Sequence, residues 1–202
     1  MTMEELRKQA AETGEVTIPG DIKVIPEGAF SGLSNLKKVT ILPGVEEIGN
    51  AAFKDCSALE SVEIPDTVKT IGSYAFCLCT SLESIELPCG ITEIGTSAFE
   101  DCNTLKRIAL PDTLSKIAVK TFLRCSSLSE VSIPDSITQI DAGAFEKCSA
   151  LASIRIPDSV NSIGLFAFGG CTALKDISIS RALFNENKKY FRPFSSWIHV
   201  RT

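Results

Sequence analysis

A chain of 202 residues with 44% hydrophobic and 22% charged residues has the composition of an ordinary globular domain. Its formal net charge of −5 argues against nucleic acid as a partner, and no apolar run reaches the roughly 18 residues that membrane insertion requires. The composition therefore predicts neither nucleic-acid binding nor membrane insertion.

Residues 1–15 are the first predicted element, an N-terminal cap that is partly helical from Met3 to Ala11. We expect no signal peptide in this charged segment, because it lacks the apolar core of a secretory leader. Two locations stay open: the cytoplasm, or the outside of a cell if the chain is a mature form. The first strand is predicted at Val16-Thr17-Ile18.

Residues 16–180 contain seven copies of a 23-residue repeat in unbroken register. Each copy has one Phe, a Leu six residues later, and then two aliphatic residues that alternate with period 2. That alternation predicts a short strand, and a fixed period of this length predicts a solenoid of stacked coils. Inward residues elsewhere recur about every three positions, which predicts 3₁₀-like turns. The Phe column comprises Phe30, Phe53, Phe76, Phe99, Phe122, Phe145 and Phe168.

A glycine follows the all-Ile column in four of the copies, at Gly49, Gly72, Gly95 and Gly164. Glycine in a recurring slot suggests a turn with positive φ. Pro26 fills the same slot in the first copy, and proline cannot adopt that conformation, which weakens the prediction.

Residues 181–202 are predicted to form a degenerate C-terminal capping repeat that keeps the 23-residue register. Counting from the last copy, Phe191 falls in the Phe slot and Val200 in the first strand slot. Phe194 and Trp197 are larger than the residues they replace, so we expect these aromatic side chains to cover the open end of the core. Leu183 and Phe184 are expected to join them.

The consensus V-x-x-I-G-x-x-A-F-x-x-C-x-x-L-x-x-I-x-I-P-D closely resembles the BspA-like class of leucine-rich repeats over residues 16 to 180. The resemblance implies a leucine-rich-repeat solenoid that is mostly β with short 3₁₀ or helical turns. It also implies a right-handed superhelix with one parallel sheet. Members of the class are mostly surface or secreted proteins, several of them implicated in adhesion, and the class has no catalytic residues.

The function expected from this resemblance is a non-enzymatic binding or adhesion module for a protein or glycan ligand, with no cofactor and no metal. The alternative is a structural spacer within a larger surface protein. An enzyme is not expected, because the sole histidine, His199, has no nucleophile that the repeat geometry would bring to it.

Six cysteines share one slot, three residues after the Phe of each copy from the second onward: Cys56, Cys79, Cys102, Cys125, Cys148 and Cys171. Because Leu33 holds this slot in the first copy, the position favours buried apolar volume. Two alternatives stay open. Adjacent coils about 4.8 Å apart would allow disulfides, whereas a metal site would need four ligands that converge on one point.

Two further cysteines fall outside this column. Cys77 directly follows Phe76 and is predicted to point outward. Cys89 occupies a turn position after the strand-ending Pro88, so we expect it to be the accessible thiol.

The outward strand positions are predicted to form the concave face, where two coils with acidic residues lie between coils with basic residues. Charge compensation between neighbouring coils would pair Lys37 with Glu60 and Lys106 with Glu83. The alternative is an electrostatically patterned surface that binds a partner. The partner-binding candidates are Lys38, Glu60, Glu63, Glu83, Glu86, Lys106 and Arg107.

Apolar residues also occur on the turn side at positions that are polar in other copies. They are either scattered or gathered into an interface. These residues are Tyr74, Leu78, Val119, Leu123, Leu165 and Phe166.

Overall fold

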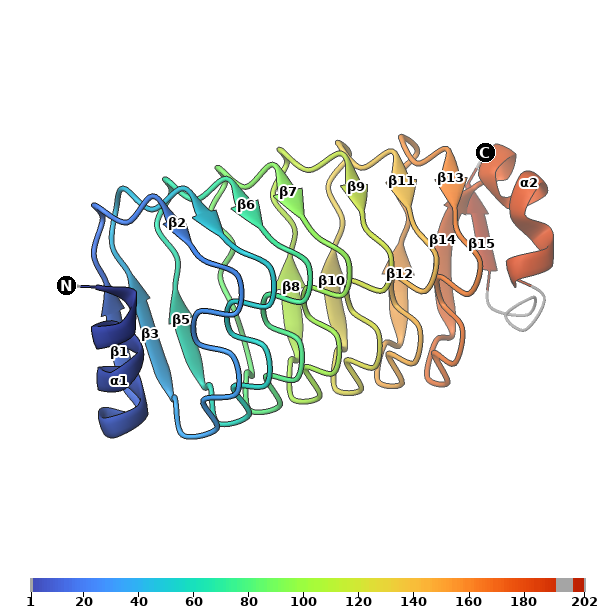
Figure 1. The fold of residues 1–202 in the computed structure, drawn as a ribbon. Helices are drawn as coiled ribbons and strands as arrows, with labels where there is room; N and C mark the ends of the chain where they lie inside the picture. Colours follow the sequence, from blue (N-terminus) through green and yellow to red (C-terminus); the bar gives the residue numbers. More distant parts are fainter. Residues whose placement is uncertain (1, 192–197, 202) are drawn as a thin grey trace.

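The computed structural model describes residues 2–191 and 198–201 as a solenoid of parallel strands with one short helix at each end (Figure 1). The coils stack into a nearly straight rod. The helices are α1 (Met3–Thr13) and α2 (Arg181–Phe191). The predicted solenoid of short parallel strands is confirmed.

Two columns of strands run along the rod. The strands of the first column carry the predicted period-2 pattern, and they are β1 (Glu15–Ile18), β3 (Lys38–Ile41), β5 (Ser61–Glu63), β8 (Arg107–Ala109), β10 (Glu130–Ser132), β12 (Ser153–Arg155), β14 (Asp176–Ser180) and β15 (Ile198–Arg201). The second column, which adds to the single sheet that the resemblance implied, contains two-residue strands. They are β2 (Val24–Ile25), β4 (Glu47–Ile48), β6 (Thr70–Ile71), β7 (Glu93–Ile94), β9 (Lys116–Ile117), β11 (Gln139–Ile140) and β13 (Ser162–Ile163).

The strand register follows the sequence period. Val16 lies opposite Val39, and Val39 lies opposite Val62, each 23 residues further along. The pairing is parallel throughout but interrupted, so each column is divided into shorter sheets. In the third coil the first column is reduced to a single bridge between Ser84 and Arg107.

The core consists of the predicted residue columns, with one stacked phenyl ring in each coil. The rings from Phe30 to Phe168 are buried, and successive centroids are 5.3 to 5.6 Å apart with interplanar angles of 4° to 12°. Each buried phenyl side chain contributes a large apolar area, and offset stacking adds to this contribution. Stacked rings also keep neighbouring coils in one register.

The turn side carries a third hydrogen-bonded array, built from residues with positive φ. In every copy the residues two before and two after the Phe have φ between 52° and 75°, as Tyr74 (59°) and Leu78 (63°) do around Phe76. The N–H groups of these three residues all donate to carbonyls of the following coil, at Thr96, Ala98 and Glu100. Every second N–H group thus donates to the following coil, while Ala75 N and Cys77 N donate to Gly72 O and Tyr74 O of their own coil. The turns therefore bind coil to coil as strands do.

The prediction of positive φ at the glycine column is wrong. Gly49, Gly72, Gly95 and Gly164 are absent from the left-handed residues, which lie two positions further on. The glycines are needed for close approach instead: a Cβ on Gly72 would lie 2.6 Å from Asn50 N in the preceding coil. A side chain at Gly72 would therefore require the adjacent coil to shift, although Pro26, Ala118 and Asp141 are accommodated in the same slot of other copies.

Helix α1 covers the N-terminal end of the core. Thr2 and Glu5 form a capping box, and Gly14 ends the helix in the left-handed conformation with φ of 76°. Leu6 and Ala10, four residues apart on one helix face, are buried. The predicted helical cap is confirmed, and it extends two residues beyond Ala11.

At the other end, α2 lies against the last coil, followed by β15 (Figure 1). Ser180 Oγ accepts a hydrogen bond from Leu183 N (3.3 Å), which caps the start of the helix. Leu183 is buried and Phe184 packs against the core, as predicted. The predicted covering role of Phe194, Trp197 and the Phe191 side chain lies outside the described residues.

The predicted register of the terminal repeat is wrong. Ile198 lies opposite Ile177, and Val200 lies opposite Ile179, so the last strand begins two residues earlier than a 23-residue period requires. The reason is local: α2 replaces the turns of a regular coil, so the chain returns to the sheet after a different number of residues.

Candidate binding surface

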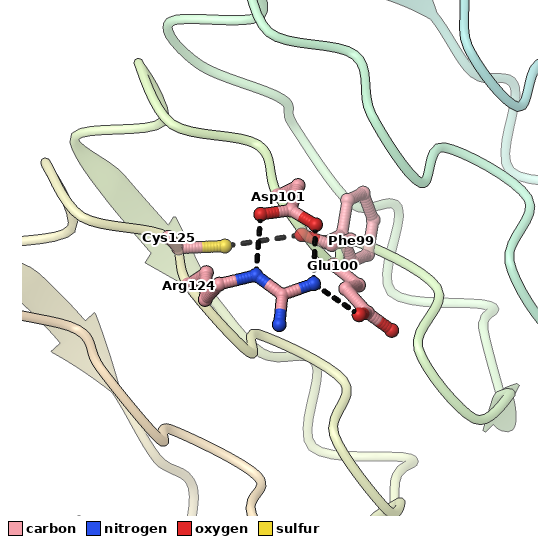
Figure 2. Close-up of polar contacts among 5 residues, drawn as sticks. All are labelled: Phe99, Glu100, Asp101, Arg124 and Cys125. Carbon is pink, nitrogen blue, oxygen red and sulfur yellow. Dashed lines mark hydrogen bonds and ion pairs between the residues drawn. The ribbon is translucent and has the colours of Figure 1, made fainter. Parts of the chain in front are cut away.

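The cysteine column is a row of buried hydrogen-bond donors. Each Sγ donates to the backbone carbonyl of the Phe in the preceding coil. Cys125 Sγ, for example, donates to Phe99 O at 3.1 Å (Figure 2). The other five Sγ–O distances are 3.1 to 3.3 Å. Each of these carbonyls also accepts a backbone N–H of its own coil, as Phe99 O does from Cys102 N. A thiol therefore satisfies the second lone pair of a buried carbonyl.

This arrangement accounts for Leu33 in the first copy. Helix α1 lies on this side of the first copy in place of a further coil, so no Phe carbonyl from a preceding coil requires a donor, and an apolar side chain fills the slot. All eight cysteines of the chain are free, which removes the disulfide alternative for this structure. Burial raises the pKa of Cys56 and of Cys171 to about 12, so both thiols stay protonated at neutral pH.

The prediction that Cys77 points outward is wrong, because this residue is 5% exposed. Tyr74 and Leu78 on either side have positive φ, which breaks the inward–outward alternation on which the prediction depended. Burial raises the pKa of the Cys77 thiol to about 11. Cys89, in contrast, is exposed.

An ionic cluster ties two adjacent coils together on the turn side (Figure 2). Arg124 donates from Nε to Asp101 Oδ1 (2.7 Å) and from Nη2 to Asp101 Oδ2 (2.6 Å) and Glu100 Oε1 (2.7 Å). These hydrogen bonds to Asp101 raise the pKa of Arg124 further. Both carboxylates are largely buried and fully engaged, so the cluster is structural.

The turn-side apolar residues do not share one environment. Tyr74, Leu165 and Phe166 are exposed, and Lys54 Nζ lies 5.6 Å from the centroid of the Tyr74 ring. Leu123 is only 5% exposed, so the prediction that it lies exposed on the turn side is wrong. Leu78 and Val119 are half-buried.

The strand face, defined here as the outward surface of the first strand column, carries most of the predicted binding residues. Several of them are engaged in ion pairs. Lys38 Nζ lies 2.8 Å from Glu63 Oε1, and Lys106 Nζ lies 2.7 Å from Glu83 Oε2. The hydrogen bond with Glu63 raises the pKa of Lys38, and it lowers the pKa of Glu63.

Two predicted pairs had different outcomes. The pairing of Lys106 with Glu83 is confirmed. Lys37 and Glu60 lie side by side, since Glu60 N donates to Lys37 O at 2.9 Å, but no ion pair joins their side chains among the described residues. Glu63 pairs with Lys38 diagonally across β3 and β5, since Lys38 lies opposite Ser61 and Glu63 lies opposite Thr40.

A groove of about 840 Å³ opens on the C-terminal half of the strand face. It is lined by small side chains from five consecutive coils, Ser84, Ala109, Ser132, Ser153 and Ser178. Long charged side chains stand among them, namely Glu86, Arg107, Glu130, Arg155 and Asp176. Small and charged side chains thus share the lining of the groove.

The groove includes only two of the predicted binding residues, Glu86 and Arg107. The others lie beside it or further towards the N-terminus. Glu130, Arg155 and Asp176 were missed because the sequence prediction favoured coils that carry two outward residues of the same charge. The groove could have been predicted from the run of Ser and Ala at outward strand positions, because these small side chains leave a hollow in the strand face.

Three charged residues of the groove have no ion-pair partner within the part of the chain that the structure describes. They are Glu86, Arg107 and Glu130, and all three are exposed. Arg155 Nη1 lies 3.2 Å from Asp135 Oδ1, and His199 Nε2 lies 3.7 Å from Asp176 Oδ1. The groove thus presents both signs of charge, and its Arg107 and Glu130 lie in register on adjacent strands without forming an ion pair.

Repeats of the BspA type leucine rich repeat region match residues 8–128 and 92–198 in six copies. The chain therefore belongs to the BspA-type leucine-rich repeat family. This family and the structures described next are repeat proteins that are generally non-enzymatic. A comparison with curated proteins found no match.

Solved structures of bacterial leucine-rich repeat proteins share the fold. A leucine rich cell surface protein from Faecalibacterium prausnitzii is 35% identical with a TM-score of 0.75, and the match covers 81% of this chain and 47% of that one. A leucine rich repeat protein of T. pallidum is 28% identical with a TM-score of 0.75, covering 87% of this chain and 82% of that one. The chain thus spans about half the length of the F. prausnitzii protein. The pneumococcal vaccine antigen PcpA, 20% identical with a TM-score of 0.50, shares the fold alone over 94% of this chain and 42% of its own.

Neither helix of the described residues has the length and apolarity needed to cross a membrane. Within the same residues, no three His, Cys, Asp or Glu side chains come together as metal ligands would.

Proposed function

We propose that this chain is a non-enzymatic protein-binding module of the adhesion type, and that the groove on the strand face is its recognition surface. The observation that carries the proposal is the set of exposed, unpaired charges at Glu86, Arg107 and Glu130 inside a hollow of about 840 Å³. Charged groups that form no intramolecular ion pair are available to a ligand, and binding does not require an existing ion pair to break.

The shape of the groove favours a protein segment over a small molecule. Small-molecule sites are concave and bury most of the ligand, whereas this groove extends openly across five coils. Its lining contains no aromatic ring on which a sugar could stack, so a protein ligand is favoured over a glycan. The absence of an aromatic anchor from the lining also points to modest affinity.

A surface role is supported by the resemblance to the F. prausnitzii structure, which is described as a leucine rich cell surface protein. A repeat rod that presents one continuous face can contact an extended partner over many coils. The alternative role is that of a spacer, in which the rod only separates other segments and its strand face binds nothing.

The test compares wild type with Glu86→Arg and Arg107→Glu in capture of extracellular-matrix and cell-surface proteins, followed by affinity measurement for each protein captured. Glu27→Arg is the matched control, because Glu27 is exposed and lies outside the groove. We expect the groove variants to weaken capture at least about tenfold and the control to leave it unchanged. Equal capture by wild type and all three variants would mean that recognition lies outside the groove. If wild type captures no protein, the spacer role is favoured.

A further inference from the structure

The charges of the groove are arranged so that the strand face is complementary to itself. In one outward column Arg107 of β8 and Glu130 of β10 lie on adjacent coils, in register with each other. In the next outward column Glu86 lies one coil before this pair and Arg155 one coil after it. About the midpoint between β8 and β10, each acidic position therefore corresponds to a basic position on the opposite side.

We infer that a second copy of the chain occupies the groove, related to the first by a two-fold axis parallel to the strands at the midpoint between β8 and β10. This inference rests on the proposed function and names the partner. In the resulting dimer Arg107 faces Glu130 of the second copy, and Glu86 faces Arg155 of the second copy. Because a two-fold interface is isologous, each contact occurs twice.

The uncharged positions fit the same axis. Ser84 faces Ser153 of the second copy, and Ala109 faces Ser132 of the second copy, so small side chains meet small side chains. The space between them accommodates the long charged side chains from both copies. Because the coils stack in a nearly straight rod (Figure 1), two such faces can run alongside each other over several coils.

Beyond the groove, the same two-fold axis brings one more pair of opposite charges together and places no like charges opposite each other. Glu60 faces Lys175 of the second copy, and both are exposed. From β5 to β14 no like charges oppose each other, whereas like charges placed opposite would cost binding energy. An axis along the rod would instead pair Arg107 with Ala109 and Glu86 with Ser84, leaving every charge unmatched, so charge complementarity selects the first axis.

Little intramolecular stabilisation is lost on dimerisation. Glu86, Arg107 and Glu130 have no ion pair to break within the described chain. Arg155 would exchange Asp135 for Glu86, and its present pair is exposed on both sides, where such pairs stabilise little. The pairs of Lys38 with Glu63 and of Lys106 with Glu83 can persist. The dimer should therefore be held by charge and weaken as salt screens it.

Sedimentation of the full chain at low and high salt, up to about 1 mM protein, tests the dimer. We expect wild type to form a dimer that weakens as salt is added. Glu86→Arg and Arg155→Glu should each raise the dissociation constant of the dimer at least about tenfold. The variant that carries both substitutions should nearly recover the wild-type dissociation constant, because it restores opposite charges at both sites. Glu27→Arg should behave as wild type. A monomeric wild type, single variants that dimerise normally, or a double exchange that recovers nothing would each overturn the inference.

Thiol cross-linking tests the axis itself. In a Cys89→Ser background, Ser84→Cys/Ser153→Cys should give a covalent dimer with a bis-maleimide of about 10 Å, the spacing of packed sheets. In one chain these positions lie three coils apart, roughly 14 Å. Neither single substitution should cross-link, because the two Ser84 positions of the dimer, and likewise the two Ser153 positions, are further apart than Ser84 and Ser153 of the second copy. Equal cross-linking by the single variants would overturn this geometry.

The two proposals fail separately. A monomeric wild type that still captures another protein, with capture lost in Glu86→Arg and kept in Glu27→Arg, overturns the second copy as the occupant. The same result leaves the groove as the recognition surface.

Discussion

Alkaline pH should unfold this protein by ionising its buried thiols. Burial raises the pKa of Cys56 and Cys171 to about 12 in the folded state, against an ordinary value of 9.0. The unfolded chain therefore loses these protons first as pH rises above 9. Stability is fully present below pH 9, decreases between pH 9 and about 12, and changes by about 1.4 kcal/mol per pH unit for each such thiol.

The six thiols of the column shift in the same direction, so together they give about 8 kcal/mol per pH unit. Domain stabilities are about 5–15 kcal/mol. The rod is therefore expected to unfold within one to two pH units above pH 9, by about pH 10–11.

Urea titrations of wild type and Cys56→Ala, followed by circular dichroism at several pH values from 8 to 10, measure the effect of one thiol. The variant is less stable at pH 8, but the difference from wild type should narrow by about 1.4 kcal/mol per unit above pH 9. Lys and Tyr titrations affect both proteins and cancel in the difference. Cys89→Ala is the control, because it removes an exposed thiol. Parallel curves for wild type and Cys56→Ala would refute the reasoning.

Two further predictions concern how the coils are held together, and urea denaturation measures both. Phe99→Leu loses two ring stacks whereas Phe30→Leu loses one, so the first should lower the free energy of unfolding by about 1 kcal/mol more; equal losses would mean that stacking adds nothing beyond burial. Gly72→Ala places a Cβ 2.6 Å from Asn50 N and should cost about 1–3 kcal/mol through separation of the coils, and an unchanged stability would show that the coils can move apart freely.

The periodicity of the sequence made most of the core predictable. A 23-residue repeat without insertions forces equivalent residues into stacked positions, so the Phe rings and the parallel strand register follow from spacing alone. Helix α1 was also predictable, because Leu6 and Ala10 are four residues apart beside charged neighbours.

The turn side could not be predicted in the same way. Period-2 alternation reports which side chains face inward only where the backbone is extended, and here two residues per coil have positive φ. Ala51, Tyr74 and Lys120 carry no sequence signal for that conformation, which arises because it aligns N–H groups with the next coil. The burial of Cys77 has the same cause.

The solenoid, its period, its core columns and the N-terminal cap follow from the amino-acid sequence, because each depends on residues at a fixed spacing. The carbonyl that each thiol contacts, the point where β15 rejoins the sheet and the position of the hollow in the strand face follow only from the folded chain. These features depend on side chains from different coils and on their relative lengths. Glu86, Arg107, Glu130 and Arg155 become one surface only when four coils are stacked, since no local pattern connects them.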